Sequence, residues 1–218
     1  MTAAPKGPLW TRARLMRVLT LRYGLNRLGH VDTVAAAQGM GVSPRTMQRW
    51  LAGRSGRQVA HLPPRRREQL VELLTPSAER VRDEHREGDY ARRAIEQVQR
   101  LDGVLPAWKE RGWLEPHQVL LLAIRPQGIR QIAVNRLSAS RSETLRRRGA
   151  VLSTLVVPTR FHATAVVRQV LHDVQPWRFQ ASPSQARQGM TQCWLDDAPP
   201  VDLAEVLARL DLPEAATP

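Results

Sequence analysis

The chain has 218 residues, 42% of them hydrophobic, so it can bury the core of one large or two modest domains, and global disorder is excluded. Its formal net charge of +13 favours a polyanionic partner, nucleic acid ahead of an anionic membrane surface. One cysteine excludes an internal disulfide framework, and the chain lacks both a signal-peptide core and a run of about 18 apolar residues that could span a membrane, so we expect a cytoplasmic, nucleoid-associated protein.

The first predicted elements are helices, because apolar residues recur there at helical spacing. We interpret the first as a supporting helix, the next two as a helix-turn-helix pair, and the fourth as a further helix opened by two prolines. The segments are residues 9–28, 32–39, 44–52 and 63–74. Together they predict a helix-turn-helix DNA-binding domain over residues 1–75.

The turn inside this motif is marked by particular residues. Gly39 and Gly41 tolerate the backbone angles of a sharp turn, and the small Ala37 allows two helices to cross closely. Ser43 can cap the next helix, and Pro44 fits its first position, where the missing N–H has no cost. Such a motif presents the N-terminal half of its second helix to the DNA major groove.

Side-chain chemistry divides residues 44–52 into a core face and a DNA face. Met47 and Trp50 are predicted to be core. Arginine pairs with guanine and glutamine with adenine, whereas hydroxyl side chains and arginines in loops or at helix starts suit phosphates. The predicted DNA-binding residues are Ser43, Arg45, Thr46, Gln48, Arg49, Arg54, Arg57, Arg65 and Arg66.

Residues 76–101 are rich in arginine, glutamate and aspartate and have few apolar positions. This composition is typical of an exposed helix stabilised by ion pairs between residues four apart. We predict that this helix, with a kink at Gly88, forms most of a helical connector over residues 76–116. The connector would serve as a spacer or as a dimer interface.

Residues 117–210 are predicted to form a basic α+β domain, followed by an acidic tail over residues 211–218. Two strands around a turn at Gly128 form a hairpin, and helices alternate with further strands. The predicted strands are 118–124, 129–134, 150–157 and 191–195, and the predicted helices are 140–148, 164–174 and 202–210. The whole chain is therefore expected to be α+β and predominantly helical, with an N-terminal helix-turn-helix bundle and a small C-terminal sheet with helices.

Parts of residues 117–195 resemble the GIY-YIG nuclease superfamily. The segments that carry the resemblance are GIRQIAV (128–134), RRGAVLSTLVV (147–157), AVVRQVL (165–171) and QGMTQCWL (188–195). The resemblance implies metal-dependent DNA cleavage, in which a tyrosine and an arginine assist attack on a phosphodiester and a glutamate holds the metal. Arg141 stands where the family places its catalytic arginine, and it is a catalytic candidate only if the chain is such a nuclease.

The chain departs from this family at the residues that perform the chemistry. Arg130 or Gln131 stands at the tyrosine-like position, and the glutamate region offers only valine, arginine and glutamine at 167–169. Glu143 and Asp173 are the only carboxylates of residues 117–195, which is a poor supply for a hard cation. Among His162, His172, Asp173 and Cys193, no pair has a tight zinc-ligand spacing. We therefore expect no metal, no cofactor and a binding protein in preference to an enzyme.

Positive charge is concentrated in two segments. Residues 1–74 carry 13 basic and 3 acidic side chains, and residues 117–195 carry 11 and 2. All but two of the basic residues are arginine, which reflects GC-rich bacterial codons, bidentate contacts to phosphate and guanine, or both. We interpret both segments as DNA-contacting surfaces, the first with stronger support.

Residues 34–53 are also similar to the N-terminal helix-turn-helix of telomere terminal proteins from linear actinobacterial replicons, a motif shared with many regulators and transposases. The sequence thus predicts a sequence-specific double-stranded DNA-binding protein. It would regulate transcription or mark a replicon or terminus on a bacterial plasmid or phage. Alternatives are a GIY-YIG nuclease, a replication or terminal protein, and an interaction adaptor with incidental charge. A homodimer and a monomer with two DNA-contacting domains are both open.

Overall fold

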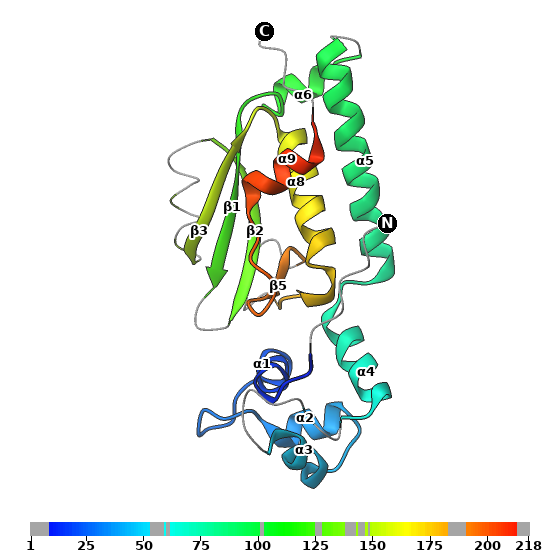
Figure 1. Ribbon diagram of the computed structural model, residues 1–218, viewed down its shortest axis with the longest axis vertical. Helices are drawn as coiled ribbons and strands as arrows, with labels where there is room; N and C mark the ends of the chain where they lie inside the picture. Colours follow the sequence, from blue (N-terminus) through cyan, green and yellow to red (C-terminus); the bar gives the residue numbers. More distant parts are fainter. Residues whose placement is uncertain are drawn as a thin grey trace. The chain divides into compact units, whose positions relative to one another are not determined.

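The structure is a computed structural model of two compact units, Met1–Thr75 and Pro76–Pro218, which we describe separately. It describes residues 9–52, 59, 62–100, 103–124, 128–137, 143, 147, 149–182 and 191–212 (Figure 1). The fold is α+β and mainly helical, with one five-stranded antiparallel sheet, as the sequence predicts.

The first unit is helical. Its helices are α1 (Arg12–Tyr23), α2 (Thr33–Gly39), α3 (Pro44–Leu51) and α4 (Pro64–Leu74). The first three begin at side chains that accept hydrogen bonds from the open backbone N–H groups of the first turn: Thr11, Asp32 and Ser43. The starts of α2, α3 and α4 lie within one residue of the predicted positions.

The prediction of a first helix reaching residue 28 is wrong. Gly24, with a φ of +85°, ends α1, and a loop closed by a bridge between Leu25 and Val31 follows. The Asn26 carboxamide oxygen accepts hydrogen bonds from the backbone N–H groups of Leu28 and His30, at 2.9 and 3.1 Å. Local hydrogen bonding of this kind competes with helix, which explains why leucines at helical spacing do not extend α1.

The core of the first unit forms where α1 packs on both α2 and α3. Ala36 and Ala37 are buried on α2, and their small side chains let the neighbouring helices approach closely. The other buried apolar side chains of the four helices are Leu15, Val18, Leu19, Met47, Trp50, Leu70 and Leu74. This packing fixes the orientation of α3.

The second unit contains the sheet. Its elements in chain order are α5 (Ala78–Arg100), α6 (Pro106–Glu110), β1 (His117–Ile124), β2 (Ile129–Arg136), β3 (Ala150–Val157), α8 (Arg160–Asp173), the 3-10 helix η1 (Gln175–Trp177), β4 (Arg178–Phe179), β5 (Cys193–Leu195) and α9 (Leu203–Leu210). The strand order is β3-β1-β2-β5-β4. The predicted hairpin is confirmed by the antiparallel pairing of β1 with β2, in which Ile124 lies opposite Ile129. The predicted helix over 140–148 falls mostly outside the described residues.

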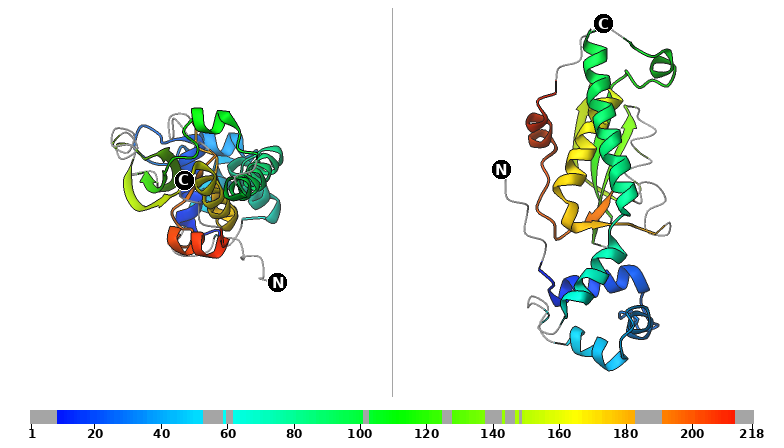
Figure 2. Two further views of the ribbon diagram at one scale, coloured as in Figure 1. Left: turned by 90° about the horizontal axis from the view of Figure 1, so that it is seen from above. Right: turned by 90° about the vertical axis from the view of Figure 1, so that its right-hand side faces the viewer.

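The second unit is layered. Figures 1 and 2 show α8 lying between the sheet and α5, while α9 packs on α8 and β3. Val119 and Leu121 of β1 and Ile132 of β2 are buried in one cluster with the valines of α8. One face of the sheet is thus covered by a helix that is itself covered by a second helix.

The segment predicted to be an exposed connector is part of this unit. Helix α5 packs along α8 and buries Ala91, Ala94 and Ile95 in a cluster with Trp108 and Phe161. The helix runs continuously through the predicted kink at residue 88. Ile95 is the only large apolar side chain among the four buried residues of α5, which explains why the sequence pattern appears too polar for a packed helix.

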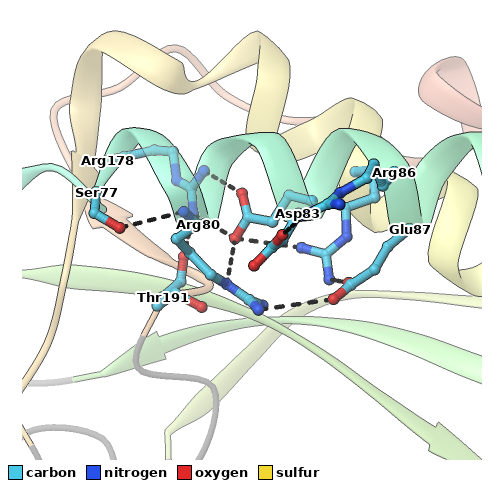
Figure 3. A network of polar contacts seen from close by, with 9 residues as sticks. Ser77, Arg80, Asp83, Arg86, Glu87, Arg178 and Thr191 are labelled. Carbon is cyan, nitrogen blue, oxygen red and sulfur yellow. Dashed lines mark hydrogen bonds and ion pairs between the residues drawn. The ribbon is translucent and has the colours of Figure 1, made fainter.

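A buried ion cluster joins α5 to the rest of the unit (Figure 3). The Glu84 side chain is only 4% exposed, and its carboxylate is paired with three guanidinium groups. Arg178 donates two hydrogen bonds to it, at 2.5 and 3.0 Å, and the Nε atom of Arg80 lies 3.2 Å away. Arg168 lies 3.4 Å from Glu84 and also bonds Glu87. These ion pairs connect α5, α8 and β4.

Replacing Glu84 with alanine would leave the buried Arg178 without its main counter-charge. We expect Glu84→Ala to lower the free energy of unfolding by about 3–5 kcal/mol, the range for breaking a buried ion pair by removing one partner. Asp83→Ala is the control, because Asp83 pairs with Arg86 on the exposed side of α5 and should cost less than about 1 kcal/mol. Urea unfolding followed by circular dichroism measures both, and equal losses would contradict the role of the cluster.

Candidate nucleic-acid interface

Helix α3 is short and is held at both ends by side chains. At its start, the Ser43 hydroxyl accepts a hydrogen bond from the Thr46 backbone N–H at 3.2 Å, and Pro44 occupies the first position. At its end, the Arg12 guanidinium donates to the carbonyl of Leu51. Because isolated helices of this length are unstable in water, these contacts and the core packing maintain the eight residues of α3.

The two faces of α3 differ sharply in burial. Met47 is 0% and Trp50 is 3% exposed, which confirms the prediction that both belong to the core. Arg45, Gln48 and Arg49 are exposed. Residues three and four apart lie on one side of a helix, so these three polar side chains form a continuous outward stripe.

The charges on this stripe are not neutralised within the described part of the chain. No ion pair between described residues involves Arg45 or Arg49. In the same unit, the Asp32 carboxylate accepts hydrogen bonds from Val34 and Ala35 at the start of α2. The stripe therefore presents two exposed guanidinium groups and one amide.

The turn before α3 explains its direction. Gly41 has a φ of +60°, a conformation that favours glycine. The Val42 N–H donates to the Ala37 carbonyl at 2.9 Å, which closes the turn onto α2. Met40, between the two glycines of the turn, is fully buried.

Arg66, which the sequence predicts to contact DNA, is instead engaged with this turn. Its guanidinium donates to the carbonyls of Met40 and Gly41, at 2.7 and 3.2 Å, and to the side chain of Gln69. A sharp turn leaves carbonyls without helical partners, and a guanidinium from α4 supplies the missing donors. Arg65, its neighbour, is exposed. The sequence alone does not distinguish the roles of two consecutive arginines. Which of them faces the turn depends on the rotation of α4 about its axis.

The remaining predicted residues fall into two groups. The hydroxyls of Ser43 and Thr46 lie 3.0 Å apart at the start of α3, next to the exposed stripe. Arg54, Arg57 and Arg141 lie outside the described residues.

The second unit places the nuclease-like positions as follows. Gln131 is buried in β2, and Arg168 packs against the carboxylates of α5. His162 is buried, with its Nδ1 atom 2.8 Å from the Thr159 hydroxyl, and burial raises the pKa of the Cys193 thiol to about 12. Within the described ranges, no three His, Cys, Asp or Glu side chains are grouped so that they could hold a metal ion.

No family model, curated protein or solved structure matches this chain. None of the helices in the described residues is long and apolar enough to cross a membrane.

The role of Arg66 can be separated from that of Arg65 by stability measurements. We expect Arg66→Ala to lower the free energy of unfolding by about 1–2 kcal/mol, because it leaves two turn carbonyls without a charged donor. Arg65→Ala, a surface substitution one residue away, should change it by less than about 0.5 kcal/mol. Urea unfolding of both variants is the measurement. If the two variants lose equal stability, Arg66 has no special role in the turn.

Proposed function

We propose that the chain is a sequence-specific double-stranded DNA-binding protein that inserts α3 into the major groove. The observation that supports this most strongly is the burial of Met47 and Trp50, which leaves Arg45, Gln48 and Arg49 exposed on the other face, with neither arginine in an ion pair among the described residues. An excess of 10 positive charges over residues 1–74 supports the same proposal, because phosphate contacts supply most of the affinity of such proteins.

The proposed contacts follow from side-chain geometry. The guanidinium of Arg45 would bind the O6 and N7 atoms of guanine, and the amide of Gln48 would bind the N6 and N7 atoms of adenine. Three residues of helix rise about 4.5 Å, slightly more than the 3.4 Å or so between base pairs, so the two side chains suit neighbouring steps. Arg49 would contact a further base or a phosphate, while Ser43 and Thr46 would bind phosphates.

We further propose that binding regulates transcription or marks an origin or terminus of a bacterial mobile element. The chain would act either as a homodimer on a palindromic site or as a monomer with a DNA contact in each unit. The weak likeness of residues 117–195 to GIY-YIG nucleases keeps cleavage as an outcome that the experiments below must detect.

Selection of bound duplexes from a random DNA pool by the full chain tests the proposal. We expect a short preferred motif, and Arg45→Ala and Gln48→Ala should each relax the preference at one position by about 1–3 kcal/mol. Arg22→Ala is the matched control, because Arg22 is exposed on α1. It should weaken binding equally for all sequences or leave it unchanged.

Two results would contradict the proposal. One is binding without sequence preference that neither α3 variant alters. The other is cleavage of supercoiled DNA in the presence of Mg²⁺ or Mn²⁺ that Arg141→Ala abolishes, which would assign the chain to the nucleases.

A further inference from the structure

A second cationic surface lies in the second unit, between the end of α6 and the start of α8. Here the guanidinium carbons of Arg111 and Arg160 lie 5.1 and 5.3 Å from the ring centroid of Trp113. Arg136 and Glu115 adjoin them as an ion pair at 3.2 Å. We call these five residues the Trp113 corner.

Packing and backbone hydrogen bonds hold the corner in place. The Trp113 ring meets Phe161 edge to face, with centroids 6.0 Å apart and an interplanar angle of 88°. The backbone N–H of Arg160 donates to the Trp113 carbonyl at 2.9 Å, and the backbone N–H of Trp113 donates to the Trp108 carbonyl at 2.8 Å. Stacking of a guanidinium on an aromatic ring restricts its rotamers, so binding would order few additional groups.

The corner has unbalanced positive charge. Glu115 is paired with Arg136, and among the described residues neither Arg111 nor Arg160 forms an ion pair. Both of these arginines are exposed. Burial lowers the pKa of the neighbouring His117, and the positive charges of Arg160 and Arg136 lower it further.

The position of Arg160 is unfavourable by itself. It is the first residue of α8, where the helix dipole disfavours a cation, so helix stability does not account for it. Stacking on Trp113 holds its guanidinium outward. The corner therefore offers two planar, doubly donating cations whose geometry suits the oxygen atoms of phosphate groups.

We propose that the Trp113 corner binds the phosphate backbone of the DNA that α3 reads, an inference that rests on the proposed function. The five residues of the corner carry three guanidinium groups and one carboxylate, an excess of positive charge that favours a polyanion. The corner lacks base-reading amides, so its contribution would be affinity without sequence preference.

The test compares the full chain with the double variant Arg111→Ala/Arg160→Ala on two duplexes. One contains only the selected motif, and the other extends it by about two helical turns on each side. On the extended duplex we expect the double variant to bind about tenfold more weakly, with the slope of log K against log salt concentration reduced by about 2, as for two lost phosphate contacts. On the short duplex, a smaller loss would place the contacted phosphates outside the motif and an equal loss would place them within it, and either result supports the corner.

Two controls separate the corner from general charge. Arg82→Ala/Arg93→Ala removes the same charge from exposed positions of α5 and should change the slope by less than about 0.5. Arg111→Lys/Arg160→Lys keeps the charge and should retain most of the slope. Thermal unfolding by circular dichroism establishes that each variant is folded.

The outcomes separate this proposal from the preceding one. If the corner variant binds the extended duplex normally while Arg45→Ala still loses its base preference, the corner proposal is overturned and the proposed function stands. Equal losses in the two alanine double variants also overturn the corner. Competition by polyglutamate as strong as that by DNA of equal charge would overturn the choice of nucleic acid. If the full chain shows no base preference but Arg111→Ala/Arg160→Ala changes the slope as predicted, only sequence-specific reading by α3 is overturned.

Discussion

The anchoring of α3 by Met47 and Trp50 is the constraint on which the proposed DNA-reading surface depends. Two buried side chains three residues apart fix the rotation of this short helix about its axis. The positive φ of Gly41 then sets the direction in which the helix leaves the turn. The outward stripe is therefore a consequence of the core and of one backbone angle, and its orientation does not require bound DNA.

Arginine performs two opposite tasks in this chain. Arg66 donates to turn carbonyls, and Arg178 is buried against Glu84, so both guanidinium groups stabilise the fold. Arg45 and Arg111 have no ion pair within the described residues and point to interactions outside the chain. The difference lies in the neighbours of each arginine. An open carbonyl or a buried carboxylate binds the guanidinium group within the chain. Burial of the opposite face of the same helix, or stacking on a tryptophan ring, leaves the guanidinium group exposed to solvent. Net charge alone therefore overstates the cationic surface that is available to a partner.

The sequence predicts best those elements whose signals are local. Ser43 with Pro44 marks the start of α3, and a continuous apolar run marks β1. The sequence does not predict the packing of α5, because its small buried alanines become a contact surface only when α8 lies against them. It also does not predict β4, because two residues are too few to show a periodicity. The same reason limits the candidate site, because the role of Arg66 depends on a turn 25 residues away.

The size of α3 bears on how many copies of the chain a specific complex needs. One eight-residue helix reads about four base pairs at most, and a motif of that length recurs about once in every 256 base pairs of random DNA. Contacts to phosphates, such as those proposed for the Trp113 corner, raise affinity without adding sequence information. A monomer would therefore be selective only where DNA structure adds the missing information, as at an end. A second α3 would supply the missing sequence information at an internal site, so under the proposed function a regulator would act as a homodimer on a palindrome and a protein of DNA termini as a monomer.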